Sequence, residues 1–257
     1  MLTQQEVAGA ANELVNEYNF NQALAEYNWG GVLSVAWANR LSLAQPPFDF
    51  DYSNRVHQWG FGGANIPDAV VNWPNFLVAL RSFLKAWHVD RKNVFPFPPN
   101  KHCTRVQTLI DLLDIPGLGI ARVSKWACFI DQANYAIYDS RVAYALRHLL
   151  SPQTNRRIFP FVGGRAAPVG QPARINQDNL IGDSRRTATA FINFLLVMRE
   201  AAIKLNTAQP LSADTQTIVG SSWTPALVEM ALFQLGETRT KTPEIARVCG
   251  IANHAWP

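Results

Sequence analysis

Apolar residues recur at helical spacing along most of this chain. The clearest stripes lie within residues 104–150, at Val106, Leu109, Ile110 and Leu113 and again at Val142, Ala145, Leu146 and Leu149. Spacing of i, i+3, i+4 and i+7 puts apolar side chains on one face, as a packed helix requires. No segment shows the strict alternation of a strand, and no repeat has a fixed period. The pattern therefore predicts an all-α fold.

Capping residues predict further helices at both ends of the chain. Thr3 and Glu6 form a capping-box pattern that opens a helix ending near Asn19. Thr224 is expected to cap a late helix that begins at Pro225 and ends before Gly236. Residues 20–45 are also predicted to be helical, with a break at Gly30-Gly31. Another helix is predicted to begin at Pro74, with its apolar face formed by Phe76, Leu80, Phe83, Leu84 and Trp87. A third is predicted from Ser184 to about Leu205, with its apolar face formed by Phe191, Phe194, Leu195 and Met198.

Two stretches between these helices read as loops. Residues 45–67 contain Pro46-Pro47, several aromatic residues and three closely spaced glycines, and predict a long irregular segment. Residues 151–182 are rich in proline, glycine and arginine and show no period, which indicates an extended, partly ordered loop. Long loops in compact domains often serve a function.

Composition indicates a folded protein that contains neither a metal cluster nor a membrane span. The chain has 257 residues, of which 48% are hydrophobic and 16% charged. Its three cysteines, Cys103, Cys128 and Cys249, are too scattered for a disulfide framework or a four-ligand metal site, and its five histidines lack metal-ligand spacing. The first residues lack a signal-peptide pattern, and no apolar run could cross a bilayer. We expect a cytoplasmic protein that uses no cofactor.

Positive charge is concentrated after residue 140. The net charge is +4, and residues 141–186 contain eight arginines against two aspartates and no other charged residue. Such a concentration suggests a surface that neutralises phosphates. A solvated face followed by a loop would give the same composition.

A tight turn at Ile115-Pro116-Gly117-Leu118-Gly119 joins two of the predicted helices. Pro116 ends the first helix, and the glycines allow backbone angles that a side chain would forbid. Unpaired N–H groups at the start of the second helix, together with its dipole, can hold an anionic oxygen. The same residues also make an ordinary turn between helices, so the hairpin alone does not decide between the two readings.

The hairpin followed by Asp139 resembles the helix-hairpin-helix (HhH-GPD) superfamily of DNA base-excision glycosylases, in particular its 8-oxoguanine-glycosylase-like bacterial branch. In that family an aspartate opens the next helix about twenty residues after the second glycine, the interval found here from Gly119 to Asp139. The resemblance covers roughly residues 100–150. It implies two helical subdomains with the motif at a DNA-binding cleft. Along the chain we expect an N-terminal helical subdomain (1–98), the helix-hairpin-helix catalytic core (99–150), and a basic loop with the C-terminal helices (151–257).

The resemblance also implies catalytic roles. Asp139 would stabilise the positive charge that develops on the sugar when the N-glycosidic bond breaks, although it equally fits the N-cap of the helix that follows. Lyase-competent members have a nucleophilic lysine two residues after the second glycine, where this chain has Ala121. Lys125 stands one helical turn further and could reach back as the Schiff-base nucleophile, or instead bind phosphate or solvent.

Further expectations concern DNA and base binding. The DNA contacts implied for the hairpin and its surroundings are Pro116, Gly117, Leu118, Gly119, Ala121, Arg122 and Arg141. Trp59, Phe61, Trp126 and Phe129 are candidates for the base pocket, and the 58–61 segment could supply a pocket wall or the wedge that fills the vacated stack. Hairpins of this family often hold a monovalent cation on backbone carbonyls.

Together these features predict a monomeric bacterial enzyme, associated with the nucleoid, that flips a base out of double-stranded DNA and removes it. Oxidised guanine is the substrate expected from the resemblance, with alkylated purines or a hypermodified phage base as alternatives, so the role could be DNA repair or phage defence. A non-catalytic DNA-binding module and a helical interaction domain are the competing interpretations.

Overall fold

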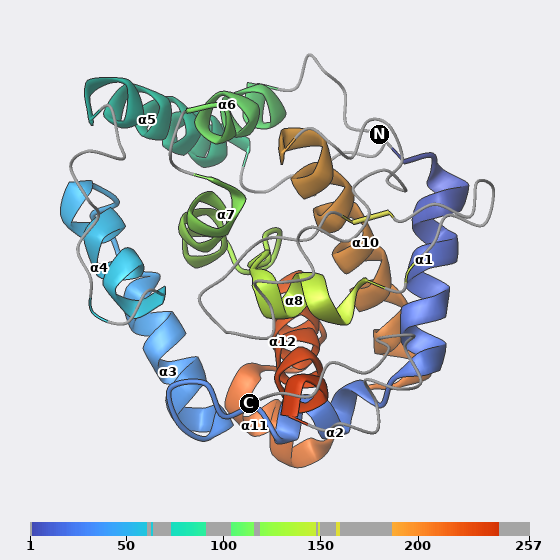
Figure 1. The fold of residues 1–257 in the computed structure, drawn as a ribbon. Helices are drawn as coiled ribbons and strands as arrows, with labels where there is room; N and C mark the ends of the chain where they lie inside the picture. Colours follow the sequence, from blue (N-terminus) through green and yellow to red (C-terminus); the bar gives the residue numbers. More distant parts are fainter. Residues whose placement is uncertain are drawn as a thin grey trace, which may run out of the picture.

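A computed structural model describes residues 2–60, 63, 73–90, 104–115, 119–147, 149, 158–159 and 187–241. Every regular element within these ranges is a helix, which confirms the all-α prediction (Figure 1). In chain order they are α1 (Gln4–Glu17), α2 (Phe20–Ala25), α3 (Leu33–Leu43), α4 (Phe50–Gly60), α5 (Trp73–Asp90), α6 (Thr104–Leu113), α7 (Gly119–Ile130), α8 (Ser140–Ala145), α10 (Thr187–Ala208), α11 (Ala213–Val219) and α12 (Pro225–Lys241).

The two ends of the described chain pack against each other. Helix α1 lies along α10, and α12 contacts α2, α8 and α10 (Figure 1). Helices α5 and α6 pack together, and α4 packs on α7. One cluster of buried hydrophobic side chains includes residues from all of these helices. The division into three segments predicted from the resemblance stays a prediction.

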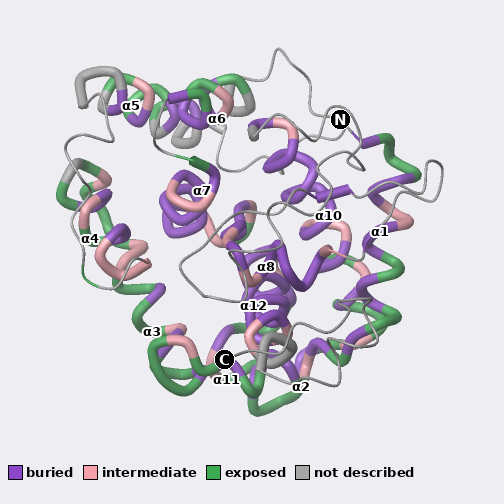
Figure 2. The backbone as a smooth tube through the Cα atoms, viewed as in Figure 1, coloured by how far each residue is buried: buried purple, intermediate pink, exposed green. Residues whose placement is uncertain are grey.

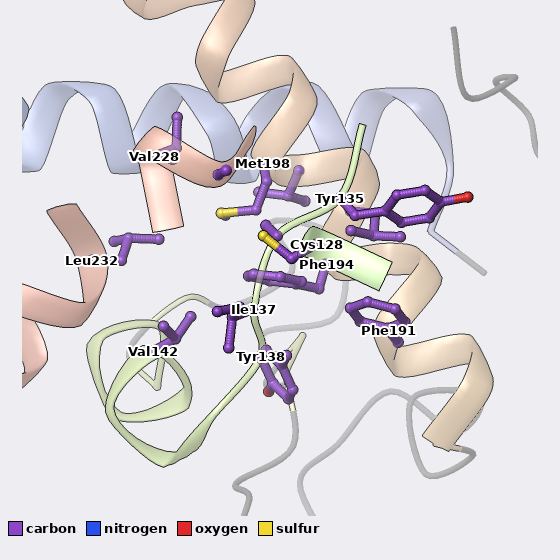
Figure 3. Packing of buried hydrophobic residues seen from close by; sticks show 14 of the residues in the cluster. Cys128, Tyr135, Ile137, Tyr138, Val142, Phe191, Phe194, Met198, Val228 and Leu232 are labelled. Carbon is purple, nitrogen blue, oxygen red and sulfur yellow. The ribbon is translucent and has the colours of Figure 1, made fainter. Parts of the chain in front are cut away.

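Helix α7 and the segment after it lie at the centre of this core (Figure 2). Cys128 of α7 and Tyr138, before α8, pack beside α10 and α12 (Figure 3). The Tyr138 ring lies 4.9 Å from the ring of Phe194. The stripe predicted for α10 is confirmed, because all four of its named residues are buried. Dense packing around α7 fixes the position of its side chains.

The predicted caps are present. The Thr3 backbone N–H donates to Glu6 Oε2 at 2.9 Å, and the Glu6 N–H donates to Thr3 Oγ1 at 3.2 Å, which completes the capping box. Thr224 Oγ1 accepts from the Leu227 N–H at 3.3 Å, and Pro225 is the first residue of α12. These side chains satisfy N–H groups that a helix leaves unpaired at its start.

The prediction of an irregular segment at 45–67 is wrong for residues 50–60, which form α4. Asp49 starts the helix, because its Oδ1 accepts from the Tyr52 N–H at 3.0 Å. Tyr52 then donates from its hydroxyl to the Trp126 carbonyl at 2.7 Å, and Trp126 Nε1 donates to the Ser53 carbonyl at 3.0 Å. This reciprocal pair of hydrogen bonds holds α4 against α7. Most of the predicted 151–182 loop lies outside the described residues.

The predicted end of the last helix before Gly236 is also wrong, because α12 continues to Lys241 with Gly236 inside it. A Cβ added at Gly236 would overlap the backbone carbonyl group of Arg141, with 2.9 Å to its carbon. The glycine therefore marks the close approach of α12 to the start of α8. It does not end the helix.

We expect Gly236→Ala to destabilise the fold by about 1–3 kcal/mol, the usual cost of overpacking. The overlapping atoms are backbone, so they cannot turn away, and the overlap outweighs the roughly 1 kcal/mol that alanine gains in helix propensity. Urea unfolding monitored by circular dichroism measures the effect. Thr207→Ala, at an exposed position of α10, is the control and should change stability by less than about 0.5 kcal/mol. A Gly236→Ala variant as stable as the wild type would contradict the close approach.

Candidate active site

A pocket lies where α3, α4, α7, α8 and α12 meet. About 30 Å³ inside it is open to water molecules, and the free space is about 320 Å³ when the mouth is counted. The inner part thus has room for one or two waters. Eleven residues line it: Tyr27, Trp29, Arg40, Trp59, Gly60, Lys125, Ile137, Asp139, Arg141, Glu229 and Phe233.

Lys125 enters the pocket from α7, in the densest part of the core. Its side chain is buried, and Nζ donates to the Ala121 carbonyl at 3.2 Å, one turn back along the helix. Lys125 stands one helical turn after Ala121, and this spacing predicts that its side chain extends back to that position. Burial lowers the pKa of the Lys125 amine, while the Asp139 and Glu229 carboxylates oppose that shift and Arg40 and Arg141 add to it. A lowered pKa leaves more of the amine neutral and nucleophilic.

Asp139 is both the N-cap of α8 and part of the pocket wall. Its Oδ1 accepts from the N–H groups of Arg141 at 3.0 Å and Val142 at 3.1 Å. Its Oδ2 has no hydrogen-bond partner among the described residues. The two readings of this aspartate are therefore compatible, because the cap uses one oxygen and the other remains for the pocket. The cap also fixes the orientation of the carboxylate.

Arg40 and Glu229 form a buried ion pair in the same wall, and sequence analysis missed both. Arg40 Nη1 donates to Glu229 Oε2 at 2.8 Å, and Nη2 donates to Oε1 at 3.3 Å. Both side chains are almost completely buried, at 1% and 0% exposure. Burial raises the pKa of Glu229, and Arg40 opposes that shift. With Lys125, Asp139 and Arg141, the pair brings five charged groups to one small pocket.

Arg141 lies at the rim, held by three neighbours. Its Nε donates to Glu237, and its guanidinium carbon lies 4.9 Å from the ring centre of Trp29 and 5.0 Å from that of Phe233. These contacts hold the side chain in place. A DNA contact by Arg141 stays a prediction.

The structure divides the predicted aromatic residues into two groups. Trp59, on the last turn of α4, lines the pocket, and its ring lies 4.9 Å from the Phe129 ring. Trp126 and Phe129 are core residues that do not line it, because their side chains face the packed interior and Trp126 bonds to α4. Phe61 lies outside the described residues. Trp29, in the segment after α2, also lines the pocket.

The hairpin itself is only partly described. Pro116, Gly117 and Leu118, and with them any cation site on the hairpin carbonyls, lie outside the described residues. Gly119 opens α7 with φ +67°, the left-handed conformation that favours glycine. Ala121 and Arg122 are half-buried on the first turns of α7. Their predicted contacts with DNA remain predictions.

Among the described residues, no group of three or more histidine, cysteine, aspartate or glutamate side chains could hold a metal ion. None of the helices in the described ranges combines the length and apolarity needed to cross a bilayer.

Replacing Lys125 by methionine should change how stability depends on pH. Because the folded-state pKa of Lys125 is lowered from 10.5, the unfolded chain binds more protons than the folded chain between the lowered pKa and 10.5. This difference makes the wild type gain stability as pH rises through that window. The stability advantage of Lys125→Met over the wild type should therefore shrink as pH rises toward 10.5.

The measurement is urea unfolding of both proteins at several pH values, taken as a difference so that tyrosine and cysteine titrations cancel. Lys204→Met, at a partly exposed position of α10, is the control for the loss of a lysine side chain outside the pocket. A flat difference for Lys125→Met would show that the Lys125 ammonium is not desolvated.

Comparisons of the chain with protein-family models, with curated proteins and with solved structures found no match.

Proposed function

We propose that this protein is a DNA glycosylase that extrudes a damaged or modified base and cleaves its N-glycosidic bond. The observation that supports this function best is the presence of Lys125 and Asp139 in the wall of one pocket. Asp139 stands at the position that the resemblance implies for the catalytic aspartate. Lys125 stands one helical turn after Ala121, the position that the resemblance implies for the nucleophilic lysine. A buried amine of lowered pKa beside a carboxylate is the arrangement that displacement at a sugar carbon requires.

Asp139 acts on the charge that forms in this reaction. As the bond between C1′ and the base lengthens, positive charge builds on the sugar, and the base leaves with the electron pair. The Asp139 carboxylate, oriented by its cap to α8, stabilises that charge. It can also accept a proton from the attacking group.

Lys125 supplies the attacking group in the lyase reaction. Its neutral nitrogen bonds to C1′ as the base leaves, and the base takes up a proton. Opening of the sugar ring then gives a protonated Schiff base, and the ring oxygen takes a proton from water to become a hydroxyl. A base then removes a proton from C2′, and the 3′ phosphate leaves with the electron pair of the C3′–O bond, which nicks the strand. Without this attack, a water molecule takes the place of Lys125 and the product is an abasic site.

Double-stranded DNA would bind through the hairpin N–H groups and the arginines that follow α8. In the sequence Arg122 precedes Lys125 and Arg141 follows Asp139. The eight arginines of 141–186 provide positive charge against the phosphates. Since the inner pocket has room for only one or two waters, an extruded base must displace side chains as it enters. At Gly60 the pocket wall has no side chain, and the lining residues nearest to this position are Trp59 and Lys125.

A panel of duplexes, each with one modified base, tests the function. Free base, abasic sites and strand nicks are scored separately, so the readouts report substrate, glycosylase activity and lyase activity. The panel includes oxidised guanine, alkylated purines and hypermodified phage bases. Salt-dependent duplex binding without release of any base would instead support a non-catalytic DNA-binding module. Absence of duplex binding would support an interaction domain.

Gly60→Ala should slow the Lys125-dependent step. A Cβ at Gly60 would lie 2.6 Å from both Cδ and Cε of Lys125, so the lysine side chain must move. We expect strand nicking to fall about tenfold or more, since small displacements of a reacting group are costly. Single-turnover nicking measures this effect. In a Lys125→Ala background the same substitution should have no further effect on the residual rate, and an equal loss in both backgrounds would contradict a role through Lys125.

A further inference from the structure

The Arg40 guanidinium, in the pocket wall, has a donor atom that is left without a partner among the described residues. Its two Nη groups bond to Glu229, and Nη2 also lies 3.4 Å from the Tyr27 hydroxyl. Nε is buried and has no hydrogen-bond partner among the described residues. Buried donors are rarely left unpaired unless the group has a further role.

The chemistry of arginine limits what can bind this donor. The guanidinium stays protonated and has no acceptor atom, so Nε–H can meet only an acceptor. Glu229 already takes the Nη groups, and Arg40 lines the pocket that contains Lys125 and Asp139. An acceptor that displaces the side chains around Nε as it enters this pocket would pair this donor.

The guanidinium is also held in a fixed orientation. Its central carbon lies 5.8 Å from the ring centre of Tyr27 and 5.7 Å from that of Trp59. The two hydrogen bonds to Glu229 fix the plane of the group as well. A donor with a fixed direction can distinguish ligands by where their acceptors lie.

We propose that Arg40 Nε–H reads a carbonyl oxygen on the extruded base and makes Arg40 a specificity-determining residue. The inference rests on the proposed glycosylase function. A carbonyl oxygen projects from the base ring and offers two lone pairs, which suits a charged donor. An exocyclic amino group at the same place would meet Nε–H donor to donor. Lactam bases, such as guanine or uracil derivatives, are therefore favoured over adenine derivatives.

Pairs of duplexes whose target bases differ in the carbonyl oxygen, and in the ring N–H that accompanies it, test this role. For the substrate that the panel identifies, the partner is its analogue with C–H in place of the carbonyl, as 2-aminopurine is to guanine. Single-turnover base release by the wild type should be about 10- to 100-fold slower for the analogue, the range expected for a hydrogen bond to a charged group. Equal rates for the two bases would overturn the inference.

Arg40→Lys provides the protein side of the test. Lysine keeps a charge for Glu229 but lacks Nε–H, so the two bases should be released at rates within about threefold of each other. Arg55→Lys is the matched control, because Arg55 is exposed on α4 and does not line the pocket. This control should keep the wild-type discrimination. If Arg40→Lys does not fold, the comparison of bases with the wild type decides alone.

The outcomes separate this inference from the function beneath it. Release of the lactam base and its analogue at equal rates, with excision intact, overturns the role of Arg40 and leaves the glycosylase function standing. The same conclusion follows if folded Arg40→Lys discriminates as the wild type does. Release of no base from any duplex overturns the proposed function, and the role of Arg40 with it.

Discussion

Asp139→Asn is expected to reduce base release by about 10²- to 10⁴-fold while leaving the fold intact. Asparagine keeps an oxygen that can accept from the N–H groups of Arg141 and Val142, so it caps α8 about as well as aspartate. It removes only the negative charge that the proposed function places beside the sugar. Single-turnover release of base from the identified substrate measures the loss, and thermal unfolding confirms that the variant is folded.

Two further variants separate charge from capping at this position. Asp139→Ala removes the cap as well and should destabilise the protein by about 1 kcal/mol in addition to losing activity. Asp131→Asn changes an aspartate that bonds to the Ala133 N–H outside the pocket, and it should keep full activity. A folded Asp139→Asn with wild-type activity would show that Asp139 serves the helix alone.

The helices that sequence reasoning predicted are those with a wide apolar stripe or a strong cap. Helix α10 has both length and an apolar face, and α1 and α12 have side-chain caps. Helix α4 was missed because its buried face consists of Tyr52, Ser53, Val56 and His57, of which two are polar. Their burial depends on the hydrogen bonds between α4 and α7, and no local pattern contains that information.

The same limit applies to the pocket. Lys125 and Asp139 lie within one motif, where a resemblance could identify them, and the structure places both in one wall. Arg40 and Glu229 are 189 positions apart, and only the fold brings them together. Residue type could not tell which aromatic candidates line the pocket. Trp59 and Trp126 are the same residue, but Trp59 faces the pocket and Trp126 faces the packed interior. Gly236 shows this limit too, since a glycine that ends a helix and one that admits a neighbouring backbone are identical in sequence.

Borohydride should trap a covalent complex between the wild-type protein and a nicked or abasic product, and Lys125→Ala should abolish it. The Schiff base needs a primary amine at the sugar carbon, and Lys125 is the lysine in the pocket wall. Lys204→Ala, at a partly exposed position on α10, should trap as well as the wild type. Denaturing electrophoresis of labelled DNA measures the adduct.

The pH dependence of trapping distinguishes attack by Lys125 from attack by an exposed amine. Because burial lowers the pKa of Lys125 below 10.5, its neutral fraction, and with it the trapping rate, should reach a plateau at a lower pH than for an ordinary lysine. Gly60→Ala, which displaces the side chain, should lower the plateau. An adduct that survives Lys125→Ala would sink this assignment. Base release without any adduct would instead indicate a hydrolase. In that case Asp139 positions water, and the Lys125 ammonium only balances the negative charge of the carboxylates in the pocket wall.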